Sequence, residues 1–482
     1  MSFQKILEKI TEKYDPKHYP SSVKPVVVAS GEPYDAGFQI GEQIKEDLAS
    51  HAMHLASHIL EVRKEDDVLA DIEKYNEILK AQSPQLLEMW RGTADGSGLP
   101  FEAMHVINIP NLMTPPKHGC STISTWGSAT ASGKLLCAVN ADGGAFTPTS
   151  FSPTMALFLK SGKACLTNGG YASNMAMNIS GMVTMASNGG WNGHPDDIGY
   201  GTPAVTSTAL LSTLADNTEE ALDIVKKMAP IGSAENLHIS DINGNACIVE
   251  ETNRKMVARR SGDHGEKDYI LATNHFISEE FADSKPADLR RSMNSMSRYR
   301  SEEQLIKENH GKITLDILNS IISCRDYFDG EWHKDIWDEE LATYTPEKRT
   351  FWNDTYMQCL VDPENRTAYF RQGQSCSTCS PIPGATGKFS KITLKNDPKA
   401  TVFDTMISTK KMFFAFAQAV ETGKNALDDL HRKNLEESKR LIWEGENYRA
   451  LAAVSPADQN RTMYNLHKAI SCFVKAQALL QF

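Results

Sequence analysis

One cysteine stands where the pattern of the sequence changes. Cys120 follows Gly119 at the end of a proline-rich turn, and polar and β-branched residues come next. A Ser-Gly turn then leads into a short apolar run that ends at Asn140 and Asp142. This order of strand, turn and strand predicts a hairpin that brings Asn140 and Asp142 back towards Cys120.

A cysteine at the start of a chain carries a nucleophile and a base on one residue. Its α-amine has a reference pKa of roughly 7.7–8.0, so near neutral pH this amine can take the proton of the thiol. The sulfur then attacks an acyl carbonyl and forms a thioester. Cys120 gains this chemistry only if the chain is cut between Gly119 and Cys120.

The same residues resemble the acyl-CoA:6-aminopenicillanic acid acyltransferase family of N-terminal-nucleophile hydrolases. Gly119-Cys120-Ser121 stands where that family has a Gly-Cys-Thr-like start, and Asn140-Ala141-Asp142 stands where it has Asn-x-Asp. The resemblance covers roughly residues 25–385. It implies a zymogen that cuts itself before Cys120, and a four-layer αββα sandwich of the α+β class.

A second informative stretch is the apolar run from Tyr269, which ends in Thr273-Asn274-His275. The family has the same ending, and its asparagine supplies an oxyanion donor, so Asn274 is predicted to stabilise the tetrahedral oxygen. The alternative is that Asn274 ends the strand with a turn hydrogen bond. His275 is a candidate general base, but the α-amine already serves, and a structural hydrogen bond is the alternative.

Two further side chains, Arg298 and Trp191, are candidate site residues. Arg298 is the arginine of a basic segment that is best placed to hold an acid or a substrate carboxylate, and a solvated helix face is the alternative. Trp191, in Gly189-Gly190-Trp191-Asn192, is a candidate wall of the substrate site, and a structural loop is the alternative. The basic segment contains Arg290, Arg291, Arg298 and Arg300.

Composition limits the partners. The 482 residues carry 50 basic and 61 acidic side chains, and this net charge of −11 argues against nucleic acid as the main partner. No run of 18 apolar residues is present, so no membrane span is expected. Residues 3–14 form a short amphipathic pattern unlike a secretory signal. Nine scattered cysteines indicate reduced thiols and a cytoplasmic protein.

No cofactor and no metal are expected. Cys376 and Cys379 form a lone CxxC without the βαβ context of a redox protein. His51, His54 and His58 fall on one helix face, but no carboxylate or cysteine completes a ligand set. The Gly-rich stretch 91–98 lacks the Lys-Ser/Thr of a phosphate loop, and we expect it to be a loop that leads towards the cysteine.

Three regions are expected. Residues 1–119 form a mainly helical pro-segment, with helices over 35–64 and over 68–89, the second kinked near Pro84. Residues 120–388 form the sandwich core, and a turn over 174–181 has Ile179 where the family usually has glutamate. Residues 389–482 form a helical extension, through which a homo-oligomer is expected. Core strands are expected at 135–139, 156–159, 182–185, 246–250 and 269–273, with a late hairpin at 356–362 and 367–370.

The function hypothesis is a hydrolase of a small linear amide that works through a thioester on Cys120. Asp142 orients the α-amine or the thiol, and Asn140 supports the turn. Bile-salt and penicillin V hydrolases usually carry arginine where this chain has Val139, which argues against that branch. One alternative is an acyltransferase that moves an acyl group from a CoA thioester or an amide to an amine. Another is an uncleaved, non-catalytic protein of the same fold.

Overall fold

The structure is a computed structural model of the chain. The residues it describes are 2–18, 25–108, 119–142, 153–168, 173–189, 195–202, 206–282, 289–324, 326–333, 337–338, 343–344, 355–372, 389–421 and 429–480.

The larger of two stacked sheets has eight strands in the order β1-β4-β5-β6-β7-β8-β9-β10. β1 runs parallel to β4, and all other neighbouring strands in this sheet are antiparallel. The strands are β1 (Val26–Gly31), β4 (Thr154–Leu159), β5 (Ala164–Asn168), β6 (Met175–Asn178), β7 (Val183–Asn188), β8 (Glu235–Ser240), β9 (Ala246–Glu251) and β10 (Met256–Arg260).

The second sheet has six antiparallel strands in the order β11-β2-β3-β16-β17-β18. The predicted hairpin is present: Cys120 on β2 lies opposite Ala141 on β3, and Ser121 lies opposite Asn140. The late hairpin is present as β16 and β17, with β18 beyond it at the edge. The strands are β2 (Cys120–Thr125), β3 (Leu136–Asp142), β11 (Tyr269–Ala272), β16 (Thr355–Asp362), β17 (Thr367–Gln372) and β18 (Phe389–Thr393).

The two sheets pack face to face, and helices cover both outer faces. Apolar side chains from both sheets, such as Val28 and Val139, share one buried core. Leu237 on β8 packs under α7 and α8, and Ile123 on β2 packs under α9 and α10. The predicted αββα sandwich of the α+β class is therefore confirmed. The covering helices are α7 (Thr206–Leu214), α8 (Thr218–Met228), α9 (Leu289–Glu308) and α10 (Leu315–Ile322).

Helices also precede the first core hairpin. The helix predicted over 35–64 is two helices, because the backbone breaks at Ile44 (φ −130°, ψ 29°). The predicted interruption at Pro84 separates α4 from α5, since proline starts a helix more readily than it continues one. These helices are α1 (Phe3–Lys13), α2 (Pro33–Gln43), α3 (Lys45–Val62), α4 (Glu65–Gln82), α5 (Pro84–Ser97) and α6 (Phe101–Asn108).

The prediction of a Gly-rich loop over 91–98 is wrong. The segment stays helical up to Ser97, and Gly98 ends α5 in the left-handed region (φ 69°). A Cβ on Gly92 would lie 2.0 Å from the Tyr34 carbonyl oxygen, and one on Gly37 would lie 2.1 Å from the Met89 carbonyl oxygen. These glycines therefore allow the backbones of α2 and α5 to contact each other directly.

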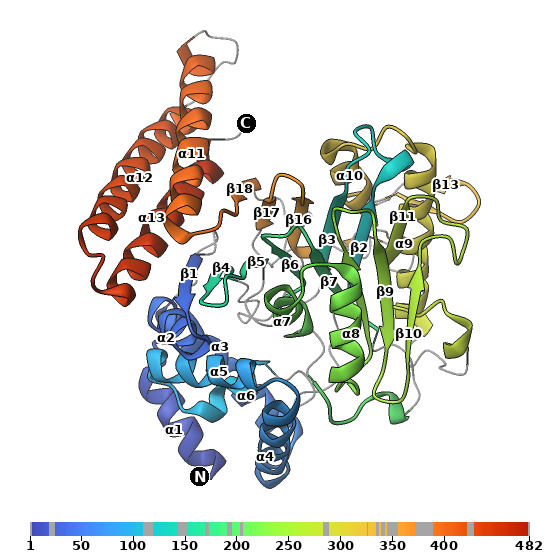
Figure 1. Cartoon of the computed structure of the whole chain (residues 1–482), viewed down its shortest axis with the longest axis horizontal. Coiled ribbons are helices and arrows are strands. Elements are labelled where there is room, and N and C mark those ends of the chain that lie inside the picture. Colours follow the sequence, from blue (N-terminus) through green and yellow to red (C-terminus); the bar gives the residue numbers. More distant parts are fainter. Residues whose placement is uncertain are drawn as a thin grey trace.

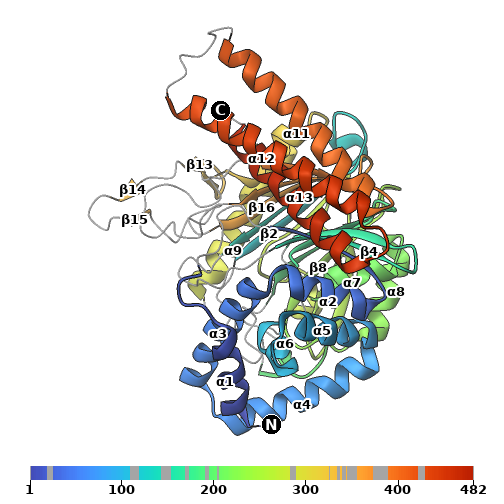
Figure 2. The same ribbon diagram turned by 90° about the vertical axis from the view of Figure 1, so that its left-hand side faces the viewer.

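The C-terminal helices are α11 (Pro398–Glu421), α12 (Asp429–Val454) and α13 (Gln459–Leu479). α11 and α13 pack along the edges of both sheets, and α12 packs on α11 and α13. His467 Nδ1 lies 2.8 Å from the Val26 carbonyl oxygen on β1, and Gln477 accepts from the Lys391 N–H on β18 at 2.6 Å. Figure 1 shows β1 between these helices and the N-terminal helices, and Figure 2 shows the same two groups of helices from the side.

The three predicted regions share the sheets. β1 lies within 1–119 and β18 within 389–482, yet each is an edge strand of a sheet whose other strands come from 120–388. The domain boundaries stay a prediction.

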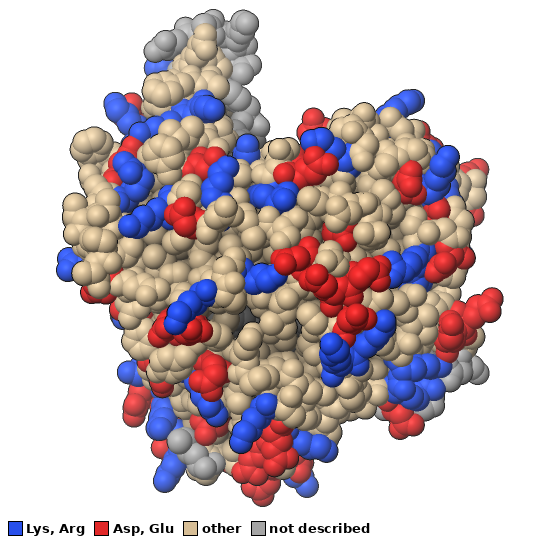
Figure 3. Space-filling model, viewed as in Figure 1, with Lys and Arg blue, Asp and Glu red and all other residues tan. Residues whose placement is uncertain are grey.

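None of the described helices combines the length and the apolar character needed to span a bilayer. On the face drawn in Figure 3, acidic and basic side chains are interspersed.

Candidate active site

Cys120 is the first residue of β2 and is buried, at 3% exposure. Gly119 continues the ladder before it, because the Gly119 N–H donates to the Asp142 carbonyl oxygen (3.2 Å) and the Asp142 N–H donates to the Gly119 oxygen (2.7 Å). Burial, reinforced by the charge of Asp142, raises the pKa of the Cys120 thiol to about 12. In the uncut chain this thiol is therefore protonated at neutral pH and needs a base.

Asn274 reaches Cys120 because β11 runs antiparallel to β2. Ala272 on β11 pairs with Thr122 on β2. Because the strands are antiparallel, Asn274, two residues after Ala272, lies beside Cys120, two residues before Thr122. The Cys120 N–H donates to Asn274 Oδ1 at 2.8 Å, and Asn274 Nδ2 donates to the Asn188 carbonyl oxygen at 2.8 Å. One of the two Nδ2–H bonds of Asn274 is thus committed to β7.

Arg298 lies at the centre of the site. It is 1% exposed, so the alternative of a solvated helix face is wrong for this arginine. Its Nη1 donates to the Cys120 carbonyl oxygen (2.5 Å) and to Ser121 Oγ (3.0 Å), while Nη2 donates to Asn274 Oδ1 (2.6 Å). Nε donates to Asn294 Oδ1 at 2.9 Å. The side chains of Arg290 and Arg291 lie outside the described part, and Arg300 is exposed.

Asp142, at the end of β3, is 2% exposed and accepts a hydrogen bond from the Thr355 hydroxyl. Burial raises its pKa, and the charge of Arg298 and the Thr355 hydrogen bond oppose this rise. A Cβ on Gly119 would lie 3.2 Å from Asp142 Oδ2 and 3.4 Å from Arg298 Nη2. Residue 119 therefore separates two oppositely charged groups, and a glycine fits this space without displacing either.

The other predicted site residues make their hydrogen bonds away from Cys120. Asn140 Nδ2 donates to the Ile322 carbonyl oxygen at 2.8 Å, so this side chain ties β3 to α10. His275 Nδ1 lies 2.8 Å from Ser295 Oγ. Burial, followed by the charge of Arg298, lowers the pKa of His275 to about 3, which makes it a neutral hydrogen-bonding group at neutral pH. Trp191 lies outside the described residues.

Two asparagines near Cys120 were missed. Asn174 Nδ2 lies 3.6 Å from Cys120 Sγ, and a backbone hydrogen bond from Asn188 lowers the pKa of the thiol. The turn predicted over 174–181 is only partly present, because residues 175–178 form β6 and the turn is confined to 179–181. Asn174 directly precedes β6 and Asn188 ends β7, so position at a strand end was the available signal. Ile179 lies at the other end of β6 from Asn174.

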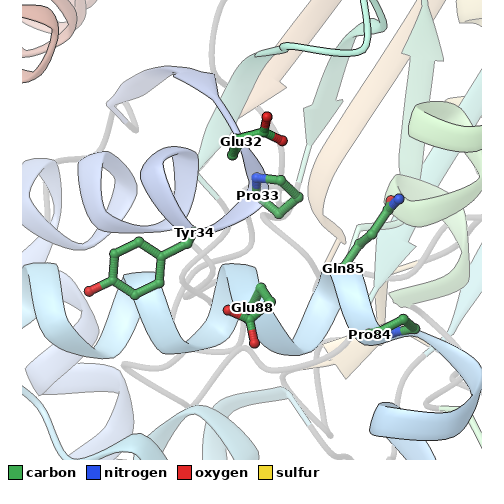
Figure 4. A pocket seen from close by; sticks show the side chains of 6 residues that line it. All are labelled: Glu32, Pro33, Tyr34, Pro84, Gln85 and Glu88. Carbon is green, nitrogen blue, oxygen red and sulfur yellow. The ribbon is translucent and has the colours of Figure 1, made fainter.

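No cluster of three or more His, Cys, Asp or Glu suited to a metal ion occurs within the described ranges. The seven cysteines that the structure describes are free thiols; Cys376 and Cys379 lie outside these ranges. A surface hollow lies between the starts of α2 and α5 (Figure 4), and its lining residues are Glu32, Pro33, Tyr34, Pro84, Gln85 and Glu88. It contains none of the site residues.

Comparison with known proteins supports acyl-transfer chemistry. Residues 130–356 match the model of the family described as acyl-coenzyme A:6-aminopenicillanic acid acyl-transferase. The match confirms the predicted family resemblance and includes Asp142, Asn274 and Arg298, although it begins after Cys120. The matched family is one of acyltransferases, which agrees with the predicted class of enzyme, an amide hydrolase or a related acyltransferase. No curated protein matches the sequence.

Solved structures resemble the chain only distantly. A mutant of conjugated bile acid hydrolase from Clostridium perfringens matches at 14% identity and a TM-score of 0.33, covering 52% of this chain and 89% of that one. Penicillin V acylase from Agrobacterium tumefaciens matches at 12% identity and a TM-score of 0.31, covering 52% of this chain and 83% of that one. Likenesses at these TM-scores add nothing to the assignment.

Proposed function

We propose that this enzyme cuts itself between Gly119 and Cys120 and then hydrolyses a small linear amide through a thioester on Cys120 Sγ. The observation that carries the proposal is the environment of Cys120. Its N–H, carbonyl oxygen and sulfur each contact a buried polar side chain, respectively Asn274, Arg298 and Asn174. A cysteine that only packs in a hydrophobic core does not require polar contacts of this kind.

In the self-cleavage step, Sγ attacks the Gly119 carbonyl carbon, and the C–N bond to Cys120 breaks after its nitrogen gains a proton. Asp142 is the proposed base, since its carboxylate acts electrostatically on the thiol. Water then hydrolyses the thioester. This gives the Gly119 carboxyl group, the free thiol and the α-amine of Cys120.

In turnover, the α-amine takes the thiol proton as Sγ attacks the substrate carbonyl, and it returns the proton to the leaving amine. Water hydrolyses the resulting acyl thioester. The uncommitted Nδ2–H of Asn274, together with Asn174, is the proposed donor to the tetrahedral oxygen. Asp142 holds the α-amine near Sγ. These roles need no metal and no cofactor, because nucleophile and base are both on Cys120.

Two alternatives remain distinct from this proposal. Transfer of the acyl group to an amine, from a CoA thioester or an amide, uses the same thioester, and faster product formation with an acyl-CoA donor and an amine would support it. An uncut, non-catalytic protein is the other.

We further propose a cytoplasmic homo-oligomer joined through the C-terminal helices, where Phe414 and Trp443 are 68% and 70% exposed.

Replacement of Asp142 by asparagine is expected to slow both self-cleavage and turnover while the fold survives. The amide keeps the shape of the side chain but removes the negative charge that faces Cys120 and Arg298. The measurement is the rate of cleavage by gel and the rate of turnover, with a melting curve as the control for folding. If turnover is unchanged across neutral pH, Asp142 only supports a turn and has no role in the reaction.

The proposed reaction class is tested with inhibitors. A thiol alkylator that modifies Cys120 is expected to abolish hydrolysis of amide substrates, and a strong chelator is expected to leave it intact. Mass spectrometry of the modified peptide identifies the alkylated cysteine. Loss of activity in the chelator, restored by zinc, would overturn the assignment.

A further inference from the structure

The main chain that carries Asn274 lies beyond the end of a strand. The pairing of β11 with β2 stops at Ala272, and Thr273 and Asn274 follow it. Both residues are buried, so the peptide group that joins them needs hydrogen-bond partners. Side chains supply the partners of its carbonyl group, because the Thr273 carbonyl oxygen accepts from Asn236 Nδ2 at 3.0 Å and from Ser187 Oγ at 2.5 Å.

Ser295 on α9 holds the other side of the same peptide group. The Asn274 N–H donates to Ser295 Oγ at 2.7 Å, and Ser295 is fully buried (0% exposed). The Thr273 hydroxyl donates to the Ser295 carbonyl oxygen at 2.9 Å, and the Ser295 hydroxyl donates to Thr273 Oγ1 at 2.9 Å. Ser295 Oγ also lies 2.8 Å from His275 Nδ1, to which this network assigns the ring proton. The Ser295 hydroxyl thus makes every hydrogen bond that it can make.

The helix α9 therefore fixes both the main chain and the side chain of Asn274. Ser295 and Arg298 are three residues apart on this helix, which places them on one face. Ser295 holds the Asn274 N–H, and Arg298 Nη2 donates to Asn274 Oδ1 at 2.6 Å. Because the Asn188 carbonyl oxygen accepts from Asn274 Nδ2 at 2.8 Å, the direction of the second Nδ2–H bond is determined as well.

We propose that Ser295 is a positioning residue for the reaction: it holds the Asn274 main chain so that the second Nδ2–H of Asn274 meets the tetrahedral oxygen. The inference rests on the proposed function, in which Asn274 is an oxyanion donor. Such a donor acts within about 2.7–3.1 Å of the oxygen. A misplacement of about 1 Å costs up to about 10²-fold in rate. Ser295 acts only through Asn274 and does not touch the substrate.

The first test is Ser295→Ala, which leaves the Asn274 N–H and His275 Nδ1 without their acceptor. Turnover is measured per cut chain, so that a change in self-cleavage does not enter the result. The value of kcat is expected to fall roughly 10- to 10²-fold, because the donor is displaced. KM is expected to change much less, because the donor acts on charge that develops only in the transition state.

Ser301→Ala is the matched control on the same helix. Ser301 is also fully buried, and its Oγ accepts from the Phe328 N–H at 2.7 Å and donates to the Ser297 carbonyl oxygen at 2.9 Å. It makes the same kind of contact to a main-chain N–H as Ser295 makes, but to β12 (Tyr327–Phe328). This variant is expected to lose stability and to keep its kcat per folded molecule. An equal fall of kcat in both variants would overturn the inference.

Combination with Asn274→Ala separates positioning from a general effect on the fold. If Ser295 acts through Asn274, Ser295→Ala causes no further fall of kcat once Asn274 is alanine, because the donor that it positions is gone. A residue that only stabilises the fold would lower kcat by the same factor in both backgrounds. That result would overturn the inference.

Ser295→Cys covers the case in which the alanine variant fails to fold. A thiol is close to a hydroxyl in shape but is a weak acceptor, so kcat is again expected to fall, and only while Asn274 is present. A folded and cut Ser295→Ala or Ser295→Cys enzyme with the wild-type kcat would overturn the inference and leave the proposed function intact. A wild-type chain that is not cut, or that hydrolyses no amide, would instead refute the proposed function.

Discussion

Replacing Cys120 by alanine is expected to leave one uncut chain with no measurable turnover. The variant removes the nucleophile of both reactions and, because the chain stays intact, also the α-amine that serves as the base. The loss is therefore expected to be complete, unlike that of any variant that removes a single contact. The measurements are gel mobility after prolonged incubation and hydrolysis of an amide substrate.

Cys472→Ala is the matched control for this variant. Cys472 is also a buried free thiol, but it lies on α13 and outside the site. It is expected to be cut and to turn over substrate at the wild-type rate. Cleavage of the Cys120→Ala chain at residue 119 would mean that another group, or another protein, makes the cut.

Asn274→Ala is expected to lower turnover by roughly 10²–10³-fold, the range found when one oxyanion donor is removed. Substrate binding is expected to change much less, because the donor acts on charge that develops only in the transition state. The variant also removes the acceptor of the Cys120 N–H and of Arg298 Nη2. Single-turnover rates on cleaved protein therefore report the donor role separately from self-cleavage.

Asn178→Ala controls for the loss of a buried amide. Asn178 is 1% exposed and donates to the Ala215 carbonyl oxygen at 2.7 Å, at the end of β6 away from Cys120. This variant is expected to lose stability but to keep its turnover per folded molecule. Near-normal turnover by Asn274→Ala would assign the oxyanion to Asn174 or to a backbone N–H.

Local signals in the sequence were sufficient for the residues on neighbouring strands. The turn between β2 and β3 fixes which residues of the hairpin face each other, and this register brings Asp142 to Gly119 and Cys120. Asn274 was predicted mainly from the family resemblance of Thr273-Asn274-His275, and its place at the end of an apolar strand agrees with this prediction. For these residues, short-range pattern and position along a strand carry the information.

Long-range packing decides the residues that the sequence did not reveal. Arg298 was named from the sequence among four arginines of one segment, but its burial against Cys120 is decided by the packing of α9 on β2. Gly92 and Gly96 indicated a loop, yet contact with α2 keeps them helical. Edge strand β18 comes from the C-terminal region, where local composition is mainly helical, and only tertiary packing assigns it to the second sheet. Asn174 and Asn188 approach Cys120 only when the two sheets stack.

The central claim is that the bond between Gly119 and Cys120 is cut by the protein itself and that the cut chain is the active form. Intact-mass spectrometry of the purified wild-type protein, followed over time with N-terminal sequencing, tests this most directly. We expect fragments of 119 and 363 residues (482 minus 119), the second beginning at Cys120, with activity rising as they form. An active protein that stays at the full 482 residues would contradict the account.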